Sequence, residues 1–362
     1  MPLDTPKPSQ SYSSSSHASQ KTYPNARYVM PPEWAPHSRT MTVWPDFSSI
    51  PDHAFLNAAR QEVSAIATAI ARFEPVTMYT RPENVEAAQA TVSRNVSVVG
   101  LEEARQLWVR DTGPIVVKDV STSRSAGLGL NFNYWGAKLP REGDEFVAER
   151  ILSGMDLSLH SCPFQAEGGA IEVDGEGTLL ATESSILNTN RNPDVNKQQM
   201  ERHFHNAFGV RKTIWLPGVK GYDMTDYHID AFVRFIKPGA VILSKPPGSA
   251  EQVTQDAYEE AKYMLDRESD AVGRQLQVFE VNEPDLGDIP GSEFGETVAS
   301  YVNYLVVNGG LIIPRFGVAS TDEDALATFR KCFPGREIVQ VHLNALPNMG
   351  GGIHCATQQV PA

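Results

Sequence analysis

Short β-rich runs alternate with helical segments along almost the whole chain, and this alternation limits the fold more than any other feature. The runs and the helices between them recur at roughly 60-residue intervals, a spacing that favours repeated supersecondary units in a cyclic, propeller-like arrangement. No composition break marks a domain boundary after the first 25 residues. We therefore expect one α/β domain over residues 26–362, built from quasi-repeated β-β-α units.

Three segments have the pattern of a β-hairpin, in which a turn-forming group separates two apolar runs. The three segments, each with its turn, are 170–184 (Asp174-Gly175), 228–246 (Pro238-Gly239) and 300–317 (Asn308-Gly309-Gly310). Shorter β-rich runs cover 76–80, 96–101, 113–120 and 128–135. Apolar residues at helical spacing predict a helix over 53–73. Further helices are expected near 83–93, 142–154, 195–208, 250–266 and 321–332.

The composition is that of a globular protein. Of the 362 residues, 41% are hydrophobic, so the chain can bury a large core without disulfide bonds. The formal net charge of −13 repels phosphate backbones, which argues against nucleic acid as a partner. No run approaches the ~20 continuous apolar residues of a membrane span, so no membrane partner is expected either.

The cysteines, Cys162, Cys332 and Cys355, are an odd number without a CxxC motif. A disulfide framework is therefore not expected, and a reducing, cytoplasmic compartment is the natural interpretation. Residues 1–25 are rich in Ser and Pro and lack an apolar stretch. We interpret them as a disordered tail and not as a secretory signal.

Two short segments suit the binding of a flat cation. In the first, Trp108 stands three residues before Asp111, directly ahead of a predicted strand. A flat cation can stack on such a ring while the carboxylate accepts its N–H groups, although a core tryptophan beside a surface ion pair is the alternative. In the second, Glu167 precedes Gly168 and Gly169, glycines that let the backbone approach another group closely or form a plain turn.

A third segment alternates carboxylates with a histidine, as Asp226, His228 and Asp230. On a strand these residues would point to one face, and buried charges there would need partners. Three interpretations stay open. They are a structural network, a metal site with His and carboxylate ligands, and an acid/base histidine oriented by one carboxylate while another binds a cationic substrate.

The fourth segment is a glycine-rich loop near the C-terminus, in which Gly350, Gly351 and Gly352 lead to Cys355. A lone cysteine is most often an inert buried residue. On a Gly-rich loop beside polar residues it is a better candidate for a nucleophile. The chain contains no Walker A loop, no G-x-S-x-G elbow and no H-E-x-x-H motif.

Together these segments resemble the agmatine deiminase and bacterial-type peptidylarginine deiminase family, part of the guanidine-modifying (pentein) superfamily. The resemblance runs from Met30 to Gln359. The matching blocks are EW-PH-R----WP (33–45), W-RDTGP (108–114), FN-WG (132–136), EGG-I-VDGEGT (167–178), LN-NRNP (187–193), TD-H-D (225–230), ASYVN (299–303) and IHC-TQQ (353–359). So many blocks in one order are far more specific than any single motif.

The resemblance implies a five-bladed α/β propeller of ββαβ units that hydrolyses a guanidino group to a ureido group and ammonia, with no cofactor and no metal. By position, Cys355 resembles the nucleophile and His228 the general acid/base. Asp111 and Asp230 resemble the carboxylates that hold the guanidinium. The other residues expected to bind substrate or support the site are Trp108, Glu167 and Asp226. The implied partner is a small cationic guanidino compound or an arginine-containing peptide, and a homodimer is compatible with the family.

Departures from the family pattern bear on the substrate. Agmatine deiminases usually carry two aspartates shortly before the tryptophan, where this chain has Arg105 and Gln106. The change removes an attraction for an ammonium group, so we expect a substrate whose far end is neutral or a carboxylate, such as arginine or a C-terminal peptidyl arginine. Tyr227 replaces a usual glycine and Gly352 a usual asparagine, and neither change removes a catalytic group.

Other functions remain compatible with these residues. An amidinotransferase or a dihydrolase would share the covalent cysteine step and differ in the acceptor or the products. A catalytically silent guanidinium-binding protein would keep the pocket without turnover.

Overall fold

The computed structural model describes residues 26–291 and 297–362. The expected disordered tail over residues 1–25 lies outside the described residues. Within them the chain is α/β, as predicted, and its strands form five sheets. In each sheet an antiparallel pair of strands is extended by a parallel strand that follows a helix. The ββαβ unit is therefore the element that repeats.

Two sheets come from the first half of the chain. The first has the order β1-β5-β6-β7, with β1 Tyr28–Val29, β5 Ile115–Asp119, β6 Ser125–Gly129, β7 Leu159–Ser161 and the helix α5 Val147–Ser153. The second has the order β10-β9-β8, with β8 Glu172–Val173, β9 Thr178–Thr182, β10 Lys212–Leu216 and the helices α6 Glu183–Ile186 and α7 Lys197–Phe208.

Two further sheets come from the second half. One contains β11 Val233–Lys237, β12 Ala240–Lys245 and β13 Gln277–Asn282, with α8 Gln252–Leu265 between β12 and β13. The other contains β14 Leu305–Val307, β15 Gly310–Arg315 and β16 Glu337–His342, with α9 Ala319–Cys332 between β15 and β16.

The fifth sheet joins the two ends of the described chain. Its order is β17-β2-β3-β4, with β17 Thr357–Pro361, β2 His37–Val43, β3 Val76–Thr80, β4 Val96–Gly100 and the helices α1 His53–Ile70 and α2 Val85–Gln89. The C-terminal strand β17 pairs antiparallel with β2, so Gln359 lies opposite Thr40. The loop that carries Cys355 is thereby fixed against the N-terminal part of the fold.

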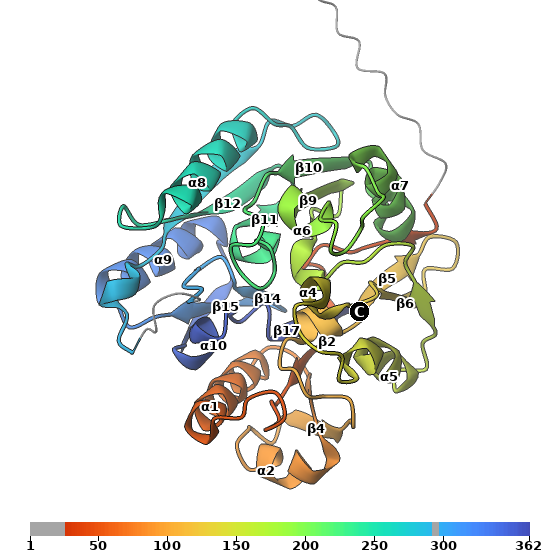
Figure 1. Ribbon diagram of the computed structural model, residues 1–362, viewed down its shortest axis with the longest axis vertical. Helices are drawn as coiled ribbons and strands as arrows, with labels where there is room; N and C mark the ends of the chain where they lie inside the picture. Colours follow the sequence, from red (N-terminus) through yellow and green to blue (C-terminus); the bar gives the residue numbers. More distant parts are fainter. Residues whose placement is uncertain (1–25, 292–296) are drawn as a thin grey trace, which may run out of the picture.

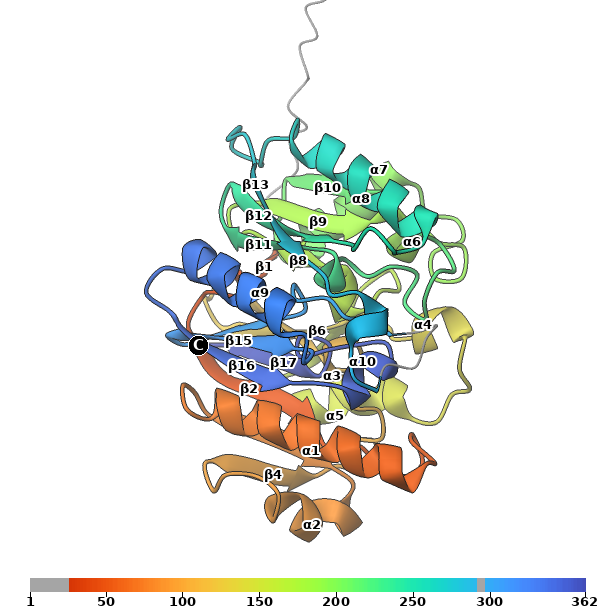
Figure 2. The same ribbon diagram turned by 90° about the vertical axis from the view of Figure 1, so that its left-hand side faces the viewer.

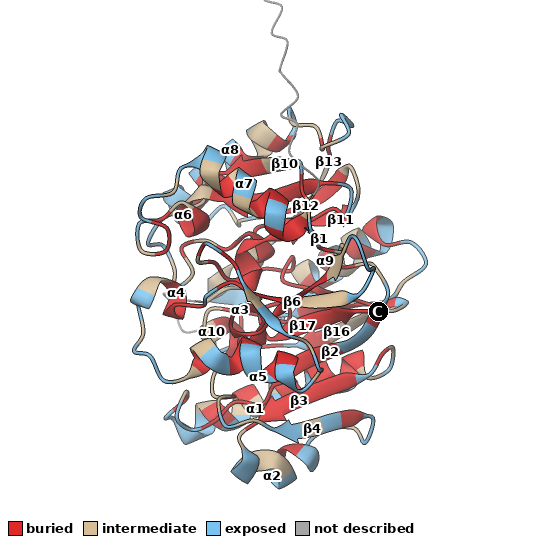
Figure 3. Cartoon of the chain, turned by 90° about the vertical axis from the view of Figure 1, so that its right-hand side faces the viewer, coloured by how far each residue is buried: buried red, intermediate tan, exposed pale blue. Residues whose placement is uncertain are grey.

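The longer helices lie outside and most strands lie inside (Figure 1). In Figure 1, α1, α5, α7, α8 and α9 follow one another around the periphery, while β17, β2 and α4 (Tyr134–Ala137) lie near the centre. In Figure 2, α1 runs between β2 on one side and β4 on the other. Figure 3 shows that most strands are buried whereas β4 and α2 face solvent. None of the helices in the described parts of the chain is both long and apolar enough to traverse a bilayer.

Local sequence signals explain where the main helices begin and end. Asp52 caps α1 by accepting the Phe55 N–H at 2.7 Å. Asn196 and Gln199 form a capping box at the start of α7, and Gly209 ends that helix with a φ of 74°. All six predicted helices are present, with boundaries shifted by a few residues. The three predicted hairpins are also present, as β8–β9, β11–β12 and β14–β15.

Two predicted strands are wrong. The run 128–135 continues β6 only to Gly129, because residues 134–137 turn in the left-handed region with φ of 60°, 53°, 84° and 59°. The segment 226–230 is not a strand either, since Asp226 and Tyr227 have φ of 62° and 74° and residues 229–231 form a 3₁₀ turn. The period-2 alternation on which that prediction relied does not apply to such a turn.

Candidate active site

Four short elements bring the polar segments of the sequence together. They are α3 (Val109–Thr112), the 3₁₀ turns η3 (Gly168–Ala170) and η4 (Ile229–Ala231), and the loop before β17. The turn η3 contacts both α3 and η4. The Arg110 N–H donates to the Cys355 carbonyl at 3.2 Å, which joins α3 to the loop. Residues far apart in the sequence therefore meet at one place.

Cys355 is a buried free thiol, 9% exposed. Its Sγ lies 3.5 Å from Asp230 Oδ2 and accepts a hydrogen bond from Asn303 Nδ2 at 3.1 Å. Burial raises the pKa of the thiol well above its usual value, and the charges of Asp230 and Asp111 raise it further. The cysteine is therefore protonated as long as no cation compensates those carboxylates.

Asp230 is fully buried, and its side chain contacts both the Cys355 thiol and the imidazole of His354. His354 Nδ1 lies 2.8 Å from Asp230 Oδ2, and His354 Nε2 lies 2.7 Å from Glu33 Oε2. Burial alone would raise the pKa of Asp230, but the hydrogen bond and charge of His354 outweigh it and lower that pKa. Asp230 is therefore an anion in the folded protein.

Three predicted site residues surround Gly169. A Cβ atom at this position would lie 2.6 Å from His228 Nδ1, 3.0 Å from Asp230 Oδ2 and 3.1 Å from Asp111 Oδ1. Only glycine fits there, so the predicted close approach of the backbone is confirmed. The same Asp230 oxygen contacts the Cys355 thiol at 3.5 Å, so the thiol and the imidazole both lie near this carboxylate.

His228 is 4% exposed and lies among carboxylates. Its Nε2 is 3.3 Å from Glu167 Oε2 and its Nδ1 is 3.8 Å from Asp111 Oδ2. Burial acts to lower the pKa of His228, but Asp111, Glu167 and Asp230 outweigh it and raise that pKa to about 9. The imidazole is therefore a cation at neutral pH and can donate a proton.

Asp111 is held by two donors. Its Oδ1 accepts the Gly169 N–H at 3.0 Å and its Oδ2 accepts the Trp135 Nε1–H at 2.9 Å. Burial raises the pKa of Asp111, and the charge of His228 opposes this. Trp108, from the same segment, is buried, and a Cβ on Gly351 would lie 2.6 Å from its Cη2. The ring thus packs directly against the cysteine loop.

Glu167 and Asp226 belong to a buried chain of ion pairs. Arg191 Nε lies 2.8 Å from Glu167 Oε1, and Arg191 Nη1 lies 2.7 Å from Asp226 Oδ2. Lys138 Nζ is 2.9 Å from the same Asp226 oxygen. These contacts lower the pKa of Asp226 to about 2 although burial opposes the change. Both oxygens of Asp226 are satisfied by protein groups, because Oδ1 accepts the Gly221 N–H.

Two polar atoms at the centre of the site have no hydrogen-bond partner among the residues that the structure describes. They are His228 Nδ1 and Asp230 Oδ1. Such groups cost free energy when buried, and a ligand with N–H donors would satisfy the carboxylate.

A second group of ligand-type residues lies behind the site. Glu33, Glu172 and His354 offer atoms within 4.8 Å of one another, a spacing that suits a metal ion. The guanidinium of Arg234 bridges the two glutamates at 2.8 Å from each. The Arg234 guanidinium therefore already occupies the position between Glu33 and Glu172 that a metal ion would take.

Sequence reasoning assigned no role to several residues that the structure places at the site. Asn303 contacts the thiol and accepts the backbone N–H groups of His354 and Cys355, and Trp135 and Arg191 hold the carboxylates. Each lies in a block of the family pattern, namely ASYVN, FN-WG or LN-NRNP, and that was the only available signal. Gly352 matters here, because a Cβ at this position would lie 2.7 Å from Asn303 Oδ1.

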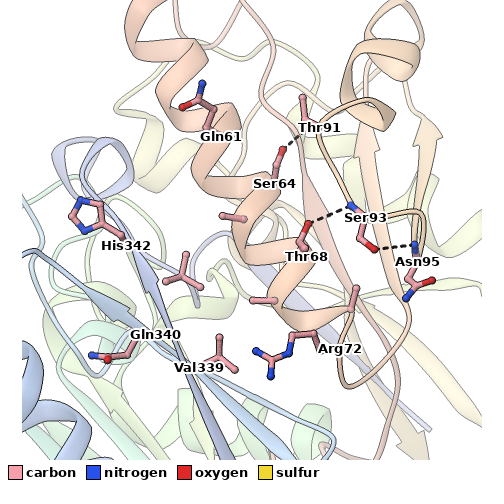
Figure 4. Close-up of a pocket in the computed structure, with 14 residues that line it drawn as sticks. Gln61, Ser64, Thr68, Arg72, Thr91, Ser93, Asn95, Val339, Gln340 and His342 are labelled. Atoms are coloured by element: carbon pink, nitrogen blue, oxygen red, sulfur yellow. Dashed lines mark hydrogen bonds between the residues drawn. The ribbon is translucent and has the colours of Figure 1, made fainter.

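A surface groove lies away from these residues. It has a volume of about 650 Å³ and is located between α1 and β16, beside the turn 91–95 (Figure 4). Its lining consists mainly of hydroxyl, amide and aliphatic groups, such as Ser64, Thr68 and Gln340. None of the residues discussed above lines it, so the candidate site is a closely packed centre and not this open groove.

Comparison with known proteins agrees with these features. The family described as Porphyromonas-type peptidyl-arginine deiminase matches residues 29–361. An agmatine deiminase of Stutzerimonas stutzeri is 38% identical over 359 residues, which cover 92% of this chain and 96% of that protein. One from Medicago truncatula is 35% identical, with 92% and 96% covered. The solved agmatine deiminase of Enterococcus faecalis superimposes with a TM-score of 0.83 at 28% identity, covering 92% of this chain and 96% of that one.

Proposed function

The chain belongs to the Porphyromonas-type peptidyl-arginine deiminase family, and from this membership and the geometry of its centre we propose that it hydrolyses a guanidino group to a ureido group and ammonia. It is then a hydrolase of carbon–nitrogen bonds in linear amidines. The observation that carries the proposal is the meeting of the Cys355 thiol, the His228 imidazole and two carboxylates around Gly169, with one oxygen of Asp230 unpaired.

The two carboxylates fit the shape of the substrate. A guanidinium is planar and presents pairs of parallel N–H groups, which carboxylates bind in a fixed plane. Asp111 and Asp230 each have an oxygen within 3.1 Å of where a Cβ on Gly169 would lie, and the Trp108 ring lies beside the cysteine loop. We assign these three residues to substrate binding. Such positioning brings the guanidinium carbon next to Sγ in a defined orientation.

The bound cation also prepares the nucleophile. The negative charges of Asp230 and Asp111 raise the pKa of the thiol in the free site. A guanidinium between them compensates those charges, so once the substrate is bound the thiol can release its proton to water, and the ammonia formed later takes that proton up. Asn303 Nδ2, at 3.1 Å, stabilises the resulting thiolate by a hydrogen bond.

The reaction then has two halves. The Cys355 thiolate adds to the guanidinium carbon, and a proton from His228 goes to the departing amino group, so that ammonia leaves and an S-alkylthiouronium remains. Neutral His228 next takes a proton from water, whose oxygen adds to the same carbon. The carbon–sulfur bond breaks and the hydroxyl proton of the adduct passes to the sulfur, which releases the ureido product and restores the Cys355 thiol beside a protonated His228.

Glu167 and Asp226 support this centre. Glu167 touches His228 and keeps it protonated, while Asp226 holds Arg191, which in turn holds Glu167. We assign Asp226 a positioning role, because its oxygens are occupied by Arg191, Lys138 and a backbone N–H.

The arrangement of sheets supports a finer description of the fold. Five ββαβ units follow one another, and the residues assigned above lie in the turns between sheets. We infer that the units form a five-bladed propeller with the site at its axis. The pairing of β17 with β2 joins the two ends, which supports a single catalytic domain over residues 26–362.

The test is product analysis with the purified protein. Wild type should release ammonia and a ureido compound in equal amounts, and an acid quench should trap a mass increase on the Cys355 peptide equal to substrate minus ammonia. Cys355→Ser should lose turnover at least ~10³-fold while still binding the guanidine. Cys332→Ala, at a buried cysteine on α9, serves as the matched control.

Different products would reject the proposal. Two equivalents of ammonia with carbon dioxide and the free amine indicate a dihydrolase, transfer to an added amine indicates an amidinotransferase, and binding without any product indicates a silent binding protein. Agmatine is the first substrate to try, because the similar proteins named above are agmatine deiminases. Arginine and a C-terminal arginyl peptide complete the panel, as Arg105 and Gln106 suggested.

A further inference from the structure

His354 directly precedes the proposed nucleophile, and the reaction described above assigns it no task. The residue is 1% exposed, and each of its ring nitrogens lies against a carboxylate. Nδ1 is 2.8 Å from Asp230 Oδ2, and Nε2 is 2.7 Å from Glu33 Oε2. The imidazole therefore connects a carboxylate of the proposed site to an acid that lies behind it.

Both of these carboxylates are ionised. Burial raises the pKa of Glu33, but the charges of Arg234 and His354 outweigh it and hold that pKa well below its usual value. Burial acts on Asp230 in the same way, and the hydrogen bond and charge of His354 lower its pKa. An ionised carboxylate only accepts hydrogen bonds, so an imidazole can donate to both only when each of its nitrogens carries a hydrogen. The two short contacts thus make His354 an imidazolium.

Glu33, on the far side of the ring, is itself held by several groups. Arg234 lies 2.8 Å from Glu33 and 2.8 Å from Glu172. Arg110 Nη2 is 3.8 Å from Glu33 Oε2, and Glu33 Oε1 accepts the Val306 N–H at 2.8 Å. Because Glu33 is fixed by these partners, it can hold the imidazole in one orientation.

The backbone of His354 is fixed as well. Its carbonyl accepts a hydrogen bond from Arg110 Nε at 3.2 Å, and its N–H donates to Asn303 Oδ1 at 2.9 Å. With ring and backbone both held, the imidazole always meets the same oxygen of Asp230, namely Oδ2. The other oxygen, Oδ1, has no hydrogen-bond partner within the described chain.

His354 is the cation that bears most directly on Asp230. Against the effect of burial, the charges of His228 and Arg234 also lower the pKa of Asp230, though less than His354 does. Among the cationic groups that the structure describes, only His354 hydrogen-bonds to this carboxylate. The titratable groups that interact electrostatically with Asp230 are Arg110, Asp111, His228, Arg234, His354 and Cys355.

We propose that His354 is a positioning residue, which pairs as an imidazolium with Oδ2 of Asp230, fixes that carboxylate and leaves Oδ1 for the guanidinium. This inference rests on the proposed function and adds to it a second histidine, which acts through Asp230. Without this cation, burial would favour the neutral carboxyl form, which does not neutralise a guanidinium. Substrate binding should then fail at a higher pH than in the protein that keeps His354.

The test compares the affinity of Cys355→Ser protein for a guanidine with that of the double variant Cys355→Ser/His354→Gln. Agmatine is titrated calorimetrically into each between about pH 5 and 8, and arginine replaces it if wild type deiminates only arginine. Glutamine keeps a neutral N–H donor but carries no charge. We expect the double variant to bind more weakly, and the ratio of the two affinities to grow by up to about tenfold for each unit by which the pH falls.

His342→Gln in the same Cys355→Ser background is the matched control, because His342 is an exposed histidine at the end of β16. Its affinity ratio should stay near one at every pH. If His354→Gln weakens binding by the same factor throughout, or not at all, the proposal is overturned, since a purely structural role does not depend on the charge of Asp230.

A second measurement decides if the double variant does not fold or if no guanidine binds. NMR of the histidine side-chain nitrogens in wild type should show hydrogen on both ring nitrogens of His354 at neutral pH, and a nitrogen without hydrogen overturns the proposal. Ile353-His354 is the only Ile-His pair in the sequence, so selective labelling of these two residue types can assign it. Ammonia release by wild type is measured separately, so failure of this inference and failure of the proposed reaction give different results.

Discussion

Asp226 and Asp230 stand four residues apart and have different surroundings. Within the part of the chain that the structure describes, Asp230 Oδ1 has no hydrogen-bond partner, whereas Asp226 is paired with Arg191 and Lys138. Strand alternation predicted one shared face, but the left-handed backbone at Asp226 and Tyr227 turns the two carboxylates apart. The motif predicted both acids as site residues, and only the backbone geometry separates the roles that we propose for them.

Asp226→Asn should destabilise the fold. Asp226 is buried, and removing its charge leaves Arg191 without one anionic partner, a change that typically costs about 3–5 kcal/mol. Because its pKa is lowered from 3.8 to about 2, the stabilisation is present above pH 3.8 and is lost as the pH falls through about 2. Chemical denaturation at neutral pH measures the effect. Asp111→Asn should abolish turnover and cost less stability, because His228 keeps its closer contact with Glu167 when the Asp111 charge is removed. The opposite ranking would contradict these assignments.

His228 should set the alkaline limit of activity. Its pKa is raised to about 9, so the imidazole carries its proton below that pH and loses it above. We expect kcat/KM to fall tenfold per pH unit above about 9.

The raised pKa of His228 also stabilises the fold. This contribution to the free energy of unfolding is complete below pH 6.5, the ordinary pKa of histidine, and disappears as the pH rises through 9. Glu167→Gln should move the kinetic limit to lower pH, and an unchanged limit would show that Glu167 does not maintain the protonated imidazole.

At the scale of elements, the periodic spacing of apolar residues predicted the regular helices and hairpins. The amphipathic helices α1, α7, α8 and α9 and the hairpins with Gly-containing turns follow directly from the sequence. The turn at 134–137 does not, because LGLNFNYW reads as an apolar strand and no local pattern signals a left-handed helix. Yet this turn directs Trp135 to Asp111 and Lys138 to Asp226. The identities of the central residues could be predicted, but the groups that hold them could not.

The strain of the turn is testable at Ala137. This residue is exposed and has a φ of 59°, a conformation that disfavours alanine by about 1 kcal/mol relative to glycine. Ala137→Gly should therefore raise the free energy of unfolding by about 0.5–1 kcal/mol, measured by chemical denaturation. Ala87→Gly, at an exposed position of the regular helix α2, should lower it by a similar amount. If both substitutions lower stability, α4 is not strained at this position.

At the scale of the whole molecule, the last strand connects catalysis to stability. Its pairing partner β2 comes from the other end of the domain, and Gln359 Oε1 accepts a hydrogen bond from Arg110 Nη1 at 2.8 Å. The sequence predicted a nucleophile near the C-terminus, but not that the residues after it close a sheet with the first strands. This pairing depends on long-range topology, which no local pattern contains.

Deleting residues 358–362 should therefore remove stability and activity together. Without most of β17, the buried edge of β2 would lose its ladder hydrogen bonds, and Arg110 would lose its contact with Gln359. We expect a clear fall in the melting temperature, faster amide exchange along β2 and loss of ammonia release. Deleting residues 1–25, interpreted from sequence as a tail, should change none of these quantities. A truncated chain that melts at the wild-type temperature but is inactive would show that β17 only positions Cys355, and that the two ends of the domain are held together by other contacts.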